Sequence, residues 1–265
     1  MKSYPPIPKE HGAWALLYGP FLVVLLAFGH LQARTFLLVA TLTAFFLAHE
    51  PLARLSRLAP TARTGARATL WKRWVGLYAI LGLLFSGLLL AFYGLWNLLP
   101  LGAGVALLLT LHLLLASKRK ERTLAGELIG ALGLTAGAPI AYYVLTEELD
   151  GTALLLWFLN LLYFVSGIFY VKMRLSRFME RNDAGQRTWN CVLYHLFLLL
   201  SLALLISQQW LSAIAIAAFA PIVIRAFWPL IRGGGGRLNL KKIGYSEVAF
   251  TAFFVLVLSL TLRAR

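Results

Sequence analysis

Nine long apolar runs constrain this chain more than any other feature. A helix that crosses a bilayer needs about 20 predominantly apolar residues, and only helices or closed barrels satisfy their backbone groups there. Hydrophobic residues make up 60% of the 265 residues, whereas charged residues make up 13%. We therefore predict an all-α polytopic membrane protein with a single transmembrane domain over residues 1–265. The predicted spans are 12–29, 35–52, 73–96, 98–116, 125–145, 152–172, 189–206, 209–228 and 246–262.

Lys and Arg are distributed unevenly between the segments that connect these spans. Of the 25 basic residues, 22 fall on the N-terminal tail and on every second connection after it, and 3 fall on the other segments. Basic connections stay in the cytoplasm, so we predict a cytoplasmic N-terminus and an external C-terminus. The same bias explains the net charge of +15 without a nucleic-acid partner. Residues 1–11 are polar and rich in proline, so no cleaved signal peptide is expected.

Two basic segments repeat at an offset of 120 residues. Residues 54–57 and 174–177 both read Arg-Leu-Ser-Arg, and the same offset relates Glu127 to Glu247. Each copy follows a long apolar run, and an even number of spans separates the copies. We therefore predict a four-helix parallel repeat in which spans two to five superpose on spans six to nine. A chance match between common residue types is the alternative.

Proline lies inside the first, fifth and eighth predicted spans, at Pro20, Pro139 and Pro221. In lipid, the backbone groups that a proline frees need partners from neighbouring helices or from a water-lined cavity. We expect these spans to be broken there, and broken spans often border a binding site. Proline is also common in ordinary membrane helices, so that alternative stays open.

Carboxylates open three of the predicted spans. Glu10 lies with Lys9 and His11 just before the first span, and Glu127 and Glu247 begin the fifth and ninth. The helix dipole alone favours a carboxylate at such a position. All three nevertheless fall at one membrane level among many basic groups. Lys9, Glu10 and His11 together could also bind a polar head group or relay protons.

His49 and Glu50 close the second span. A carboxylate so near the hydrocarbon is costly unless it is paired. Arg54 follows four residues later, which is the spacing of an ion pair on a helix. Pro51 lies between them, and we expect it to disturb that geometry.

A polar stripe runs along the sixth span. Asn160, Tyr163, Ser166 and Tyr170 are three to four residues apart, so they share one face of a helix. Such a stripe in lipid is expected to face the bundle interior. Helix–helix hydrogen bonding and a binding groove explain it equally well.

Three other residues are each alone inside an apolar run. We expect His112 and His195 to be packed histidines, and Cys191 offers neither a disulfide nor a thiolate metal site. The chain has no His-Glu-x-x-His motif and no Ser-His-Asp pattern. Hydrolytic and zinc chemistry therefore have no support.

Residues 8–15, which read Pro-Lys-Glu-His-Gly-Ala-Trp-Ala, are a fairly specific motif. Together with the His-Glu-Pro of residues 49–51 and the later Arg-rich connections, they resemble the YwiC-like family of bacterial membrane proteins. The resemblance covers essentially the whole chain and implies a location in the bacterial inner membrane. It implies no particular activity.

The layout also resembles the UbiA superfamily of intramembrane prenyltransferases, which have nine helices and Asp-rich motifs after the second and sixth helices. Lys118 and Arg119 match the Lys-Arg that follows the fourth helix in that family, and Tyr170 matches the Tyr of the second motif. With Tyr170 as the anchor, the Asp positions of the second motif fall on Gly167 and Arg174. The first Asp-rich motif is replaced in residues 48–54. The resemblance therefore implies the fold, with a phosphate ligand contacted directly by Arg and Lys instead of through magnesium.

Taken together, we expect a cytoplasm-facing cavity that binds an anionic amphiphile, either an isoprenoid diphosphate or a phospholipid, without a metal or other cofactor. His49 and Glu50 are the candidates for acid–base chemistry, and whether the protein is an enzyme stays open. The alternatives are a proton-coupled transporter or flippase, and a non-catalytic membrane subunit whose protein partner is unknown. The predicted ligand-binding residues are Lys9, Glu10, His11, His49, Glu50, Arg54, Lys118, Arg119, Glu127, Tyr170 and Arg174.

Overall fold

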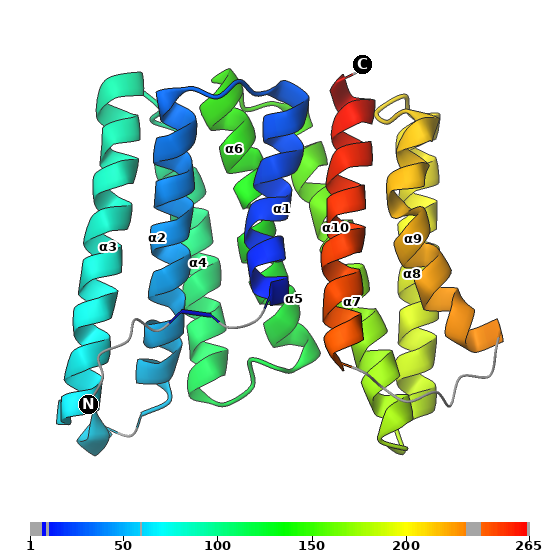
Figure 1. Cartoon of the computed structure of the whole chain (residues 1–265), viewed down its shortest axis with the longest axis horizontal. Helices are drawn as coiled ribbons and strands as arrows, with labels where there is room; N and C mark the ends of the chain where they lie inside the picture. Colours follow the sequence, from blue (N-terminus) through cyan, green and yellow to red (C-terminus); the bar gives the residue numbers. More distant parts are fainter. Residues whose placement is uncertain (1–6, 9–10, 59, 232–239, 264–265) are drawn as a thin grey trace.

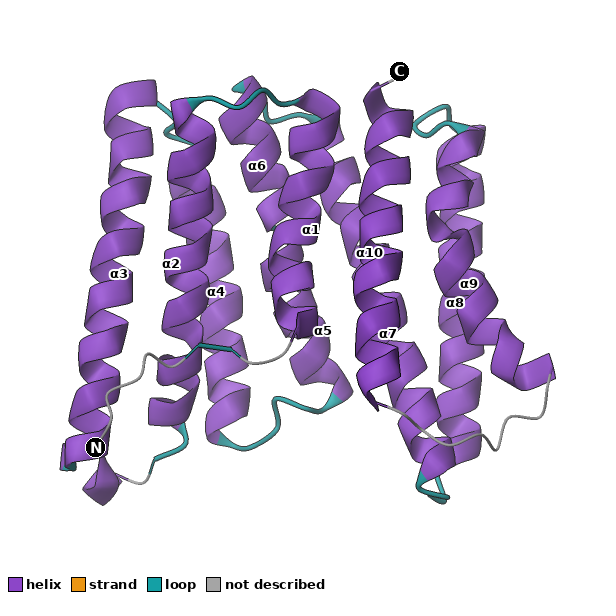
Figure 2. Cartoon of the chain, viewed as in Figure 1, coloured by secondary structure: helices purple, strands orange, loops and turns teal. Residues whose placement is uncertain are grey.

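The computed structural model describes residues 7–8, 11–58, 60–231 and 240–263, and its regular structure over these residues is helical throughout (Figures 1 and 2). Seven segments are long and apolar enough to cross a membrane, and two shorter apolar helices accompany them. The chain is therefore a multi-pass membrane protein, as predicted. The helices are α1 (His11–Phe28), α2 (Ala33–Ser56), α3 (Ala66–Tyr93), α4 (Leu98–Ser117), α5 (Leu124–Thr135), α6 (Gly137–Thr146), α7 (Gly151–Phe178), α8 (Ala184–Ser207), α9 (Ile216–Ile231) and α10 (Leu240–Arg263).

The fifth predicted span is broken into α5 and α6 at Ala136. Pro139 is the third residue of α6. A proline is tolerated in the first turn of a helix because the N–H groups there have no intrahelical acceptor. The break next to Pro139 was therefore predictable from the sequence.

The other prolines do not break their helices, so the expected breaks in the first and eighth spans are wrong. Pro20, Pro51 and Pro221 lie inside continuous α1, α2 and α9. A proline removes one hydrogen bond, to the residue four positions before it, and its ring crowds that preceding turn. The turn after it is unaffected, which is why the Glu50–Arg54 pair across Pro51 is preserved.

The eighth span begins later than predicted. Residues 208–212 form a turn, with Gln209 in the left-handed region at a φ of 63°. Ser212 then accepts a hydrogen bond from the backbone N–H of Ile214 and opens a short 3-10 helix (Ala213–Ala215) that leads into α9. The apolar side chains of Trp210 and Leu211 hid this turn in the sequence.

The buried core lies where α1, α6, α7 and α10 meet. α1 packs between α6 and α10 and also contacts α7, while α7 packs against α8 and α9. Leu156, Leu159, Phe219 and Phe254 are fully buried there. In contrast, α4 has no buried residue in its apolar window, as expected for a helix that faces lipid. An apolar helix can remain exposed in a membrane at no hydrophobic cost, because lipid tails are as apolar as its own side chains.

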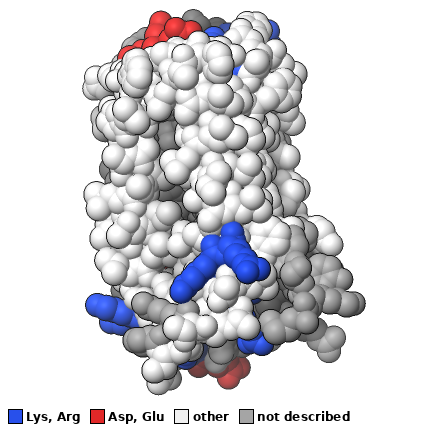
Figure 3. All heavy atoms as spheres, turned by 90° about the vertical axis from the view of Figure 1, so that its left-hand side faces the viewer, with Lys and Arg blue, Asp and Glu red and all other residues white. Residues whose placement is uncertain are grey.

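The two ends of the bundle differ in charge. At the lower end in Figure 1, α2 and α7 end and α3, α5 and α8 begin, and the basic segments 54–57 and 174–177 both lie there. The flank shown in Figure 3 is uncharged over the upper middle of the spans; charged side chains of both signs lie at the two ends, and basic ones also lie below the middle. At the upper end, Arg34 pairs with Glu147 at 2.6 Å. Superposition of the two proposed repeat halves stays a prediction.

Candidate functional site

A cavity of about 2140 Å³ lies among α1 to α6 and reaches α7, α8 and α10 at its lower end. Its upper part is lined by apolar side chains such as Leu38, Leu89, Leu98 and Ile140. All of the ionisable side chains that line it lie toward the lower end. The acidic and imidazole groups are His49, Glu50, His112, Glu121, Glu127, Asp183 and Glu247, and the basic groups are Arg54, Arg57, Arg122, Lys172, Arg181 and Arg187.

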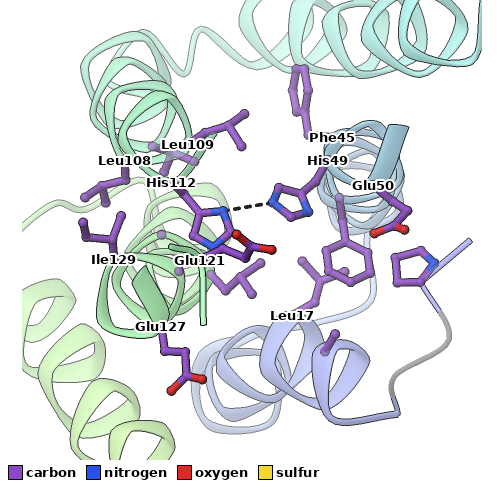
Figure 4. Close-up of a pocket in the computed structure, with 18 of the residues that line it drawn as sticks. Leu17, Phe45, His49, Glu50, Leu108, Leu109, His112, Glu121, Glu127 and Ile129 are labelled. Carbon is purple, nitrogen blue, oxygen red and sulfur yellow. Dashed lines mark hydrogen bonds between the residues drawn. The ribbon is translucent and has the colours of Figure 1, made fainter. Parts of the chain in front are cut away.

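Two histidines meet across this cavity. His49 of α2 and His112 of α4 point toward each other (Figure 4), with Nε2 of His49 3.2 Å from Nδ1 of His112. In this hydrogen bond one ring nitrogen donates and the other accepts, and the tautomers of the two rings decide which is the donor. The expectation that His112 is only a packed histidine is therefore wrong. The sequence contained a signal for this pairing. His49 precedes Arg54 by five residues and His112 precedes Lys118 by six, so both histidines are expected at about the same depth in the membrane.

Ion pairs surround the two histidines. Glu50 accepts hydrogen bonds from Arg54, with 2.8 Å between Oε1 and Nη2. Arg57, the residue directly after α2, pairs at 2.9 Å with Glu121, which precedes α5. The Arg57–Glu121 bridge links the end of α2 to the α4–α5 connection, and both residues line the cavity.

One further ion pair joins α5 to α7, and another lies at the start of α8. Nζ of Lys172 on α7 lies 2.9 Å from a carboxylate oxygen of Glu127 on α5, and it also donates to the carbonyl of Arg122. Asp183, before α8, pairs with Arg187 at 2.7 Å. The hydrogen bond from Arg187 holds the pKa of the Asp183 carboxyl below its usual range. Each of these carboxylates is thus paired with a cation that is also able to form an ion pair with an anionic ligand.

Behind the cavity wall, Arg225 of α9 pairs with Glu247 of α10. The Arg225 side chain is only 8% exposed, and its guanidinium lies 4.3 Å from the Tyr170 ring and 5.4 Å from the Phe250 ring. Nε and Nη2 of Arg225 have no hydrogen-bond partner among the described residues. Glu247 itself lines the cavity, and it lies against Gly167 of α7.

The polar stripe of α7 faces the bundle interior, as predicted. Ser166 is buried and hydrogen-bonds Nε2 of His195 at 2.9 Å, so His195 is the packed histidine that the sequence suggested. Tyr163 contacts Thr251 of α10 at 3.4 Å, and Asn160 donates to the carbonyl of Leu156. Helix–helix hydrogen bonding therefore explains Ser166 and Tyr163, whereas the bond of Asn160 stays within α7.

Of the predicted ligand-binding residues, His49, Glu50, Arg54 and Glu127 line the cavity. Lys9 and Glu10 lie outside the described residues, as does the side chain of His11 at the start of α1. The other four are not among the described residues that line it: Lys118, Arg119, Tyr170 and Arg174.

These four misplacements have physical causes. Lys118 and Arg119 are exposed in the turn after α4, and Tyr170 is buried beneath Arg225. Arg174 is two residues beyond Lys172 on α7, and two residues rotate a helix by about 200°. Lys172 therefore occupies the place in the cavity that the sequence had suggested for Arg174.

Most of the other ionisable residues in the cavity were not predicted to line it. Which of them meet depends on which helices become neighbours, and the only sequence signal was that the connections are rich in lysine and arginine. The missed cavity residues are Arg57, His112, Glu121, Arg122, Lys172, Arg181, Asp183, Arg187 and Glu247.

Comparison with known proteins identifies both a family and a fold. A family model described as YwiC-like protein matches residues 7–142. Uncharacterized protein YwiC from Bacillus subtilis (strain 168) is 26% identical over 260 residues, which cover 96% of this chain and 97% of that protein.

A solved structure of digeranylgeranylglyceryl phosphate synthase, an enzyme of the UbiA type, superposes with a TM-score of 0.64 and covers 100% of this chain and 99% of that chain. The two sequences are 11% identical. At that identity the likeness shows the fold alone.

Proposed function

The chain belongs to the YwiC-like family and has a UbiA-like fold, and from these two facts we propose that its cavity binds an amphiphile with a phosphate-bearing head group. The polarity gradient of the cavity carries the proposal, because apolar residues line its upper part and ionisable residues its lower end. A ligand with a long hydrocarbon tail and a charged head matches that gradient. The structurally similar synthase is named for a lipid phosphate, which supports the same class of ligand.

The head group is held by arginine and lysine side chains directly. Arg57, directly after α2, and Lys172 of α7 both line the cavity, and each is paired with a carboxylate. A phosphate would take over these cations, since charge-assisted bonds to phosphate are among the strongest in proteins. Arg122 lines the same end of the cavity. An isoprenoid diphosphate and a phospholipid share this phosphate chemistry.

Direct contact replaces a magnesium bridge in this proposal. The resemblance to prenyltransferases puts Gly167 and Arg174 where that family has aspartates, and hard cations such as Mg²⁺ need oxygen ligands. Five carboxylates among the described residues line the cavity, and each pairs with a cation: Glu50, Glu121, Glu127, Asp183 and Glu247. His49 and Glu50 are the groups placed to exchange a proton with a bound head group. We assign no transfer reaction to them.

The test is a binding measurement on the purified protein in lipid nanodiscs. Lipids that co-purify are first identified by mass spectrometry, and farnesyl diphosphate and phosphatidic acid are then titrated with and without EDTA. We expect binding of at least one of the two, unchanged by EDTA and weakened about tenfold or more by Lys172→Ala or Arg57→Ala. Loss of binding in EDTA would contradict direct contact. Failure of both ligands to bind would contradict the proposal itself.

A proton-coupled transporter is the second candidate, and one observation favours it. The His49–His112 pair lies in the cavity beside Glu50 and near Glu121, and chains of such groups carry protons in many transporters. Acid-driven movement of a fluorescent phospholipid across proteoliposomes would support this function. His49→Ala should abolish the acid dependence, and movement that is independent of pH would exclude coupling.

A further inference from the structure

Charges of both signs are nearly balanced at the lower end of the cavity. Six basic residues and five carboxylates line it among the described residues, and each of these carboxylates is paired with a cation. A phosphate that takes over one of the cations leaves its carboxylate without a partner, and a partly buried charge without a partner is costly. A head group that brings a cation together with its phosphate avoids that cost.

Two adjacent residues of the α4–α5 connection provide one incomplete group of each sign. Glu121 and Arg122 both line the cavity. Oε1 of Glu121 pairs with Arg57, whereas Oε2 is buried and has no hydrogen-bond partner among the described residues. Arg122 is the one basic residue of the described lining that forms no ion pair with a described carboxylate. The connection thus presents an acceptor that lacks a donor beside a cation that lacks an anion.

Lys172 of α7 adds a second cation at this place. Its Nζ donates to the backbone carbonyl of Arg122 at 2.9 Å, so the lysine lies directly against the α4–α5 connection. Glu121, one residue before Arg122, lies near His112 (Figure 4). Neighbouring residues are about 3.8 Å apart along the chain. A phosphate held by Arg122 and Lys172 therefore leaves Glu121 within reach of the next group of the same head.

We propose that the cavity binds a phospholipid whose head group carries a primary amine, with the phosphate on Arg122 and Lys172 and the ammonium group on Glu121. This inference rests on the proposed function and deepens it, because it selects a zwitterionic phospholipid over an isoprenoid diphosphate. An ammonium group has three N–H donors, enough to satisfy Oε2 of Glu121 and to replace Arg57 at Oε1. Arg57 then joins the phosphate. A diphosphate brings several negative charges and no donor for Glu121.

The size of the cavity agrees with a lipid that has two chains. Pockets for small molecules typically measure about 300–1,000 Å³, and this cavity measures about 2140 Å³. Its upper part is lined by apolar side chains, which lose packing contacts wherever the space beside them stays empty. Two acyl chains fill more of that apolar volume than one prenyl chain does.

The experiment compares three dioleoyl lipids that differ only in the head group. Phosphatidylethanolamine has the phosphate and the ammonium donors, phosphatidylcholine has the same charges without N–H donors, and phosphatidic acid has no amine. Native mass spectrometry of the purified protein in detergent measures the binding of each. We expect phosphatidylethanolamine to bind about tenfold or more tightly than either of the others.

Equal binding of phosphatidylethanolamine and phosphatidic acid would overturn the amine site and leave the proposed function in place. Preference for phosphatidylcholine would also overturn it, because that head group has no N–H for Glu121. If none of the three lipids binds, the inference is wrong, and farnesyl diphosphate then decides whether the proposed function survives.

Glu121→Gln tests the residue assigned to the ammonium group. The amide keeps the size of the side chain and removes its charge, so we expect the preference for phosphatidylethanolamine over phosphatidic acid to fall about tenfold. Glu180→Gln is the matched control, since Glu180 is exposed in the α7–α8 connection and is not among the described residues that line the cavity. A general loss of stability lowers both affinities and leaves their ratio unchanged. A ratio that Glu121→Gln does not change would overturn the assignment.

Discussion

The carboxylate of Glu247 on α10 lies against Gly167 on α7, with Oε2 of Glu247 3.6 Å from the position that a β-carbon on Gly167 would take. The resemblance to prenyltransferases places an aspartate at position 167. A carboxylate is therefore present at this place in the bundle, but α10 supplies it, and Arg225 pairs with it. The absence of a side chain at position 167 leaves room for that pair.

Restoring an aspartate at Gly167 should destabilise the protein. Gly167→Asp brings a second carboxylate against Glu247 with one arginine to share, and a buried polar group without a partner costs about 1–3 kcal/mol. Gly167→Ala is the control, because its β-carbon would make only an ordinary contact. Replacing glycine also restricts the unfolded chain, which should stabilise the protein by about 0.4–1 kcal/mol. Thermal unfolding in detergent compares the two. Equal stability of both variants would show that Glu247 does not constrain position 167.

Breaking the Arg225–Glu247 pair should cost more than removing both of its members. Arg225→Met leaves Glu247 without its cation and removes the cation from above Tyr170, and loss of one partner of a buried pair typically costs about 3–5 kcal/mol. Glu247 is 24% exposed, so we expect the lower end of that range. Adding Glu247→Gln to Arg225→Met should recover part of the loss. An additive double variant would argue against direct coupling.

The two cavity histidines should be energetically coupled. In a double-mutant cycle with His49→Ala and His112→Ala, we expect a coupling of about 1 kcal/mol in the free energy of unfolding, which is typical of one hydrogen bond. His49 and His195 provide the control cycle, because His195 is bonded to Ser166 instead. Those two substitutions should add within about 0.5 kcal/mol. A coupling near zero between His49 and His112 would contradict the pairing.

Reporter fusions should place the lower end of the bundle in the cytoplasm. Of the 25 Lys and Arg residues, 22 belong to the predicted inner segments, and this bias sets the orientation of membrane proteins. Phosphatase fusions should be active after Leu149 and after the C-terminus, and inactive after Lys120 and Asn182. An inactive fusion at the C-terminus would contradict the predicted orientation.

Much of the fold was predictable because the length and apolarity of a membrane span are local properties. The nine predicted spans correspond to nine helical segments among the residues that the structure describes, with α5 and α6 together as one, and the break between α5 and α6 follows from Pro139. The start of α9 was missed because Trp210 and Leu211 are apolar although the chain turns there. In addition, Pro51 was expected to disturb the Glu50–Arg54 pair, but the ring of a proline affects the turn that precedes it.

The helical membrane fold could be predicted from the sequence alone, as could one member of several polar contacts near the ends of spans, such as His49, Glu50 and Glu127. Most of their partners depend on how the helices pack. Whether Lys172 or Arg174 enters the cavity depends on the rotation of α7 about its axis, at about 100° per residue. A soluble helix reveals that rotation through its apolar stripe, but a span that is apolar all round conceals it. Packing against its neighbours is what fixed the rotation here.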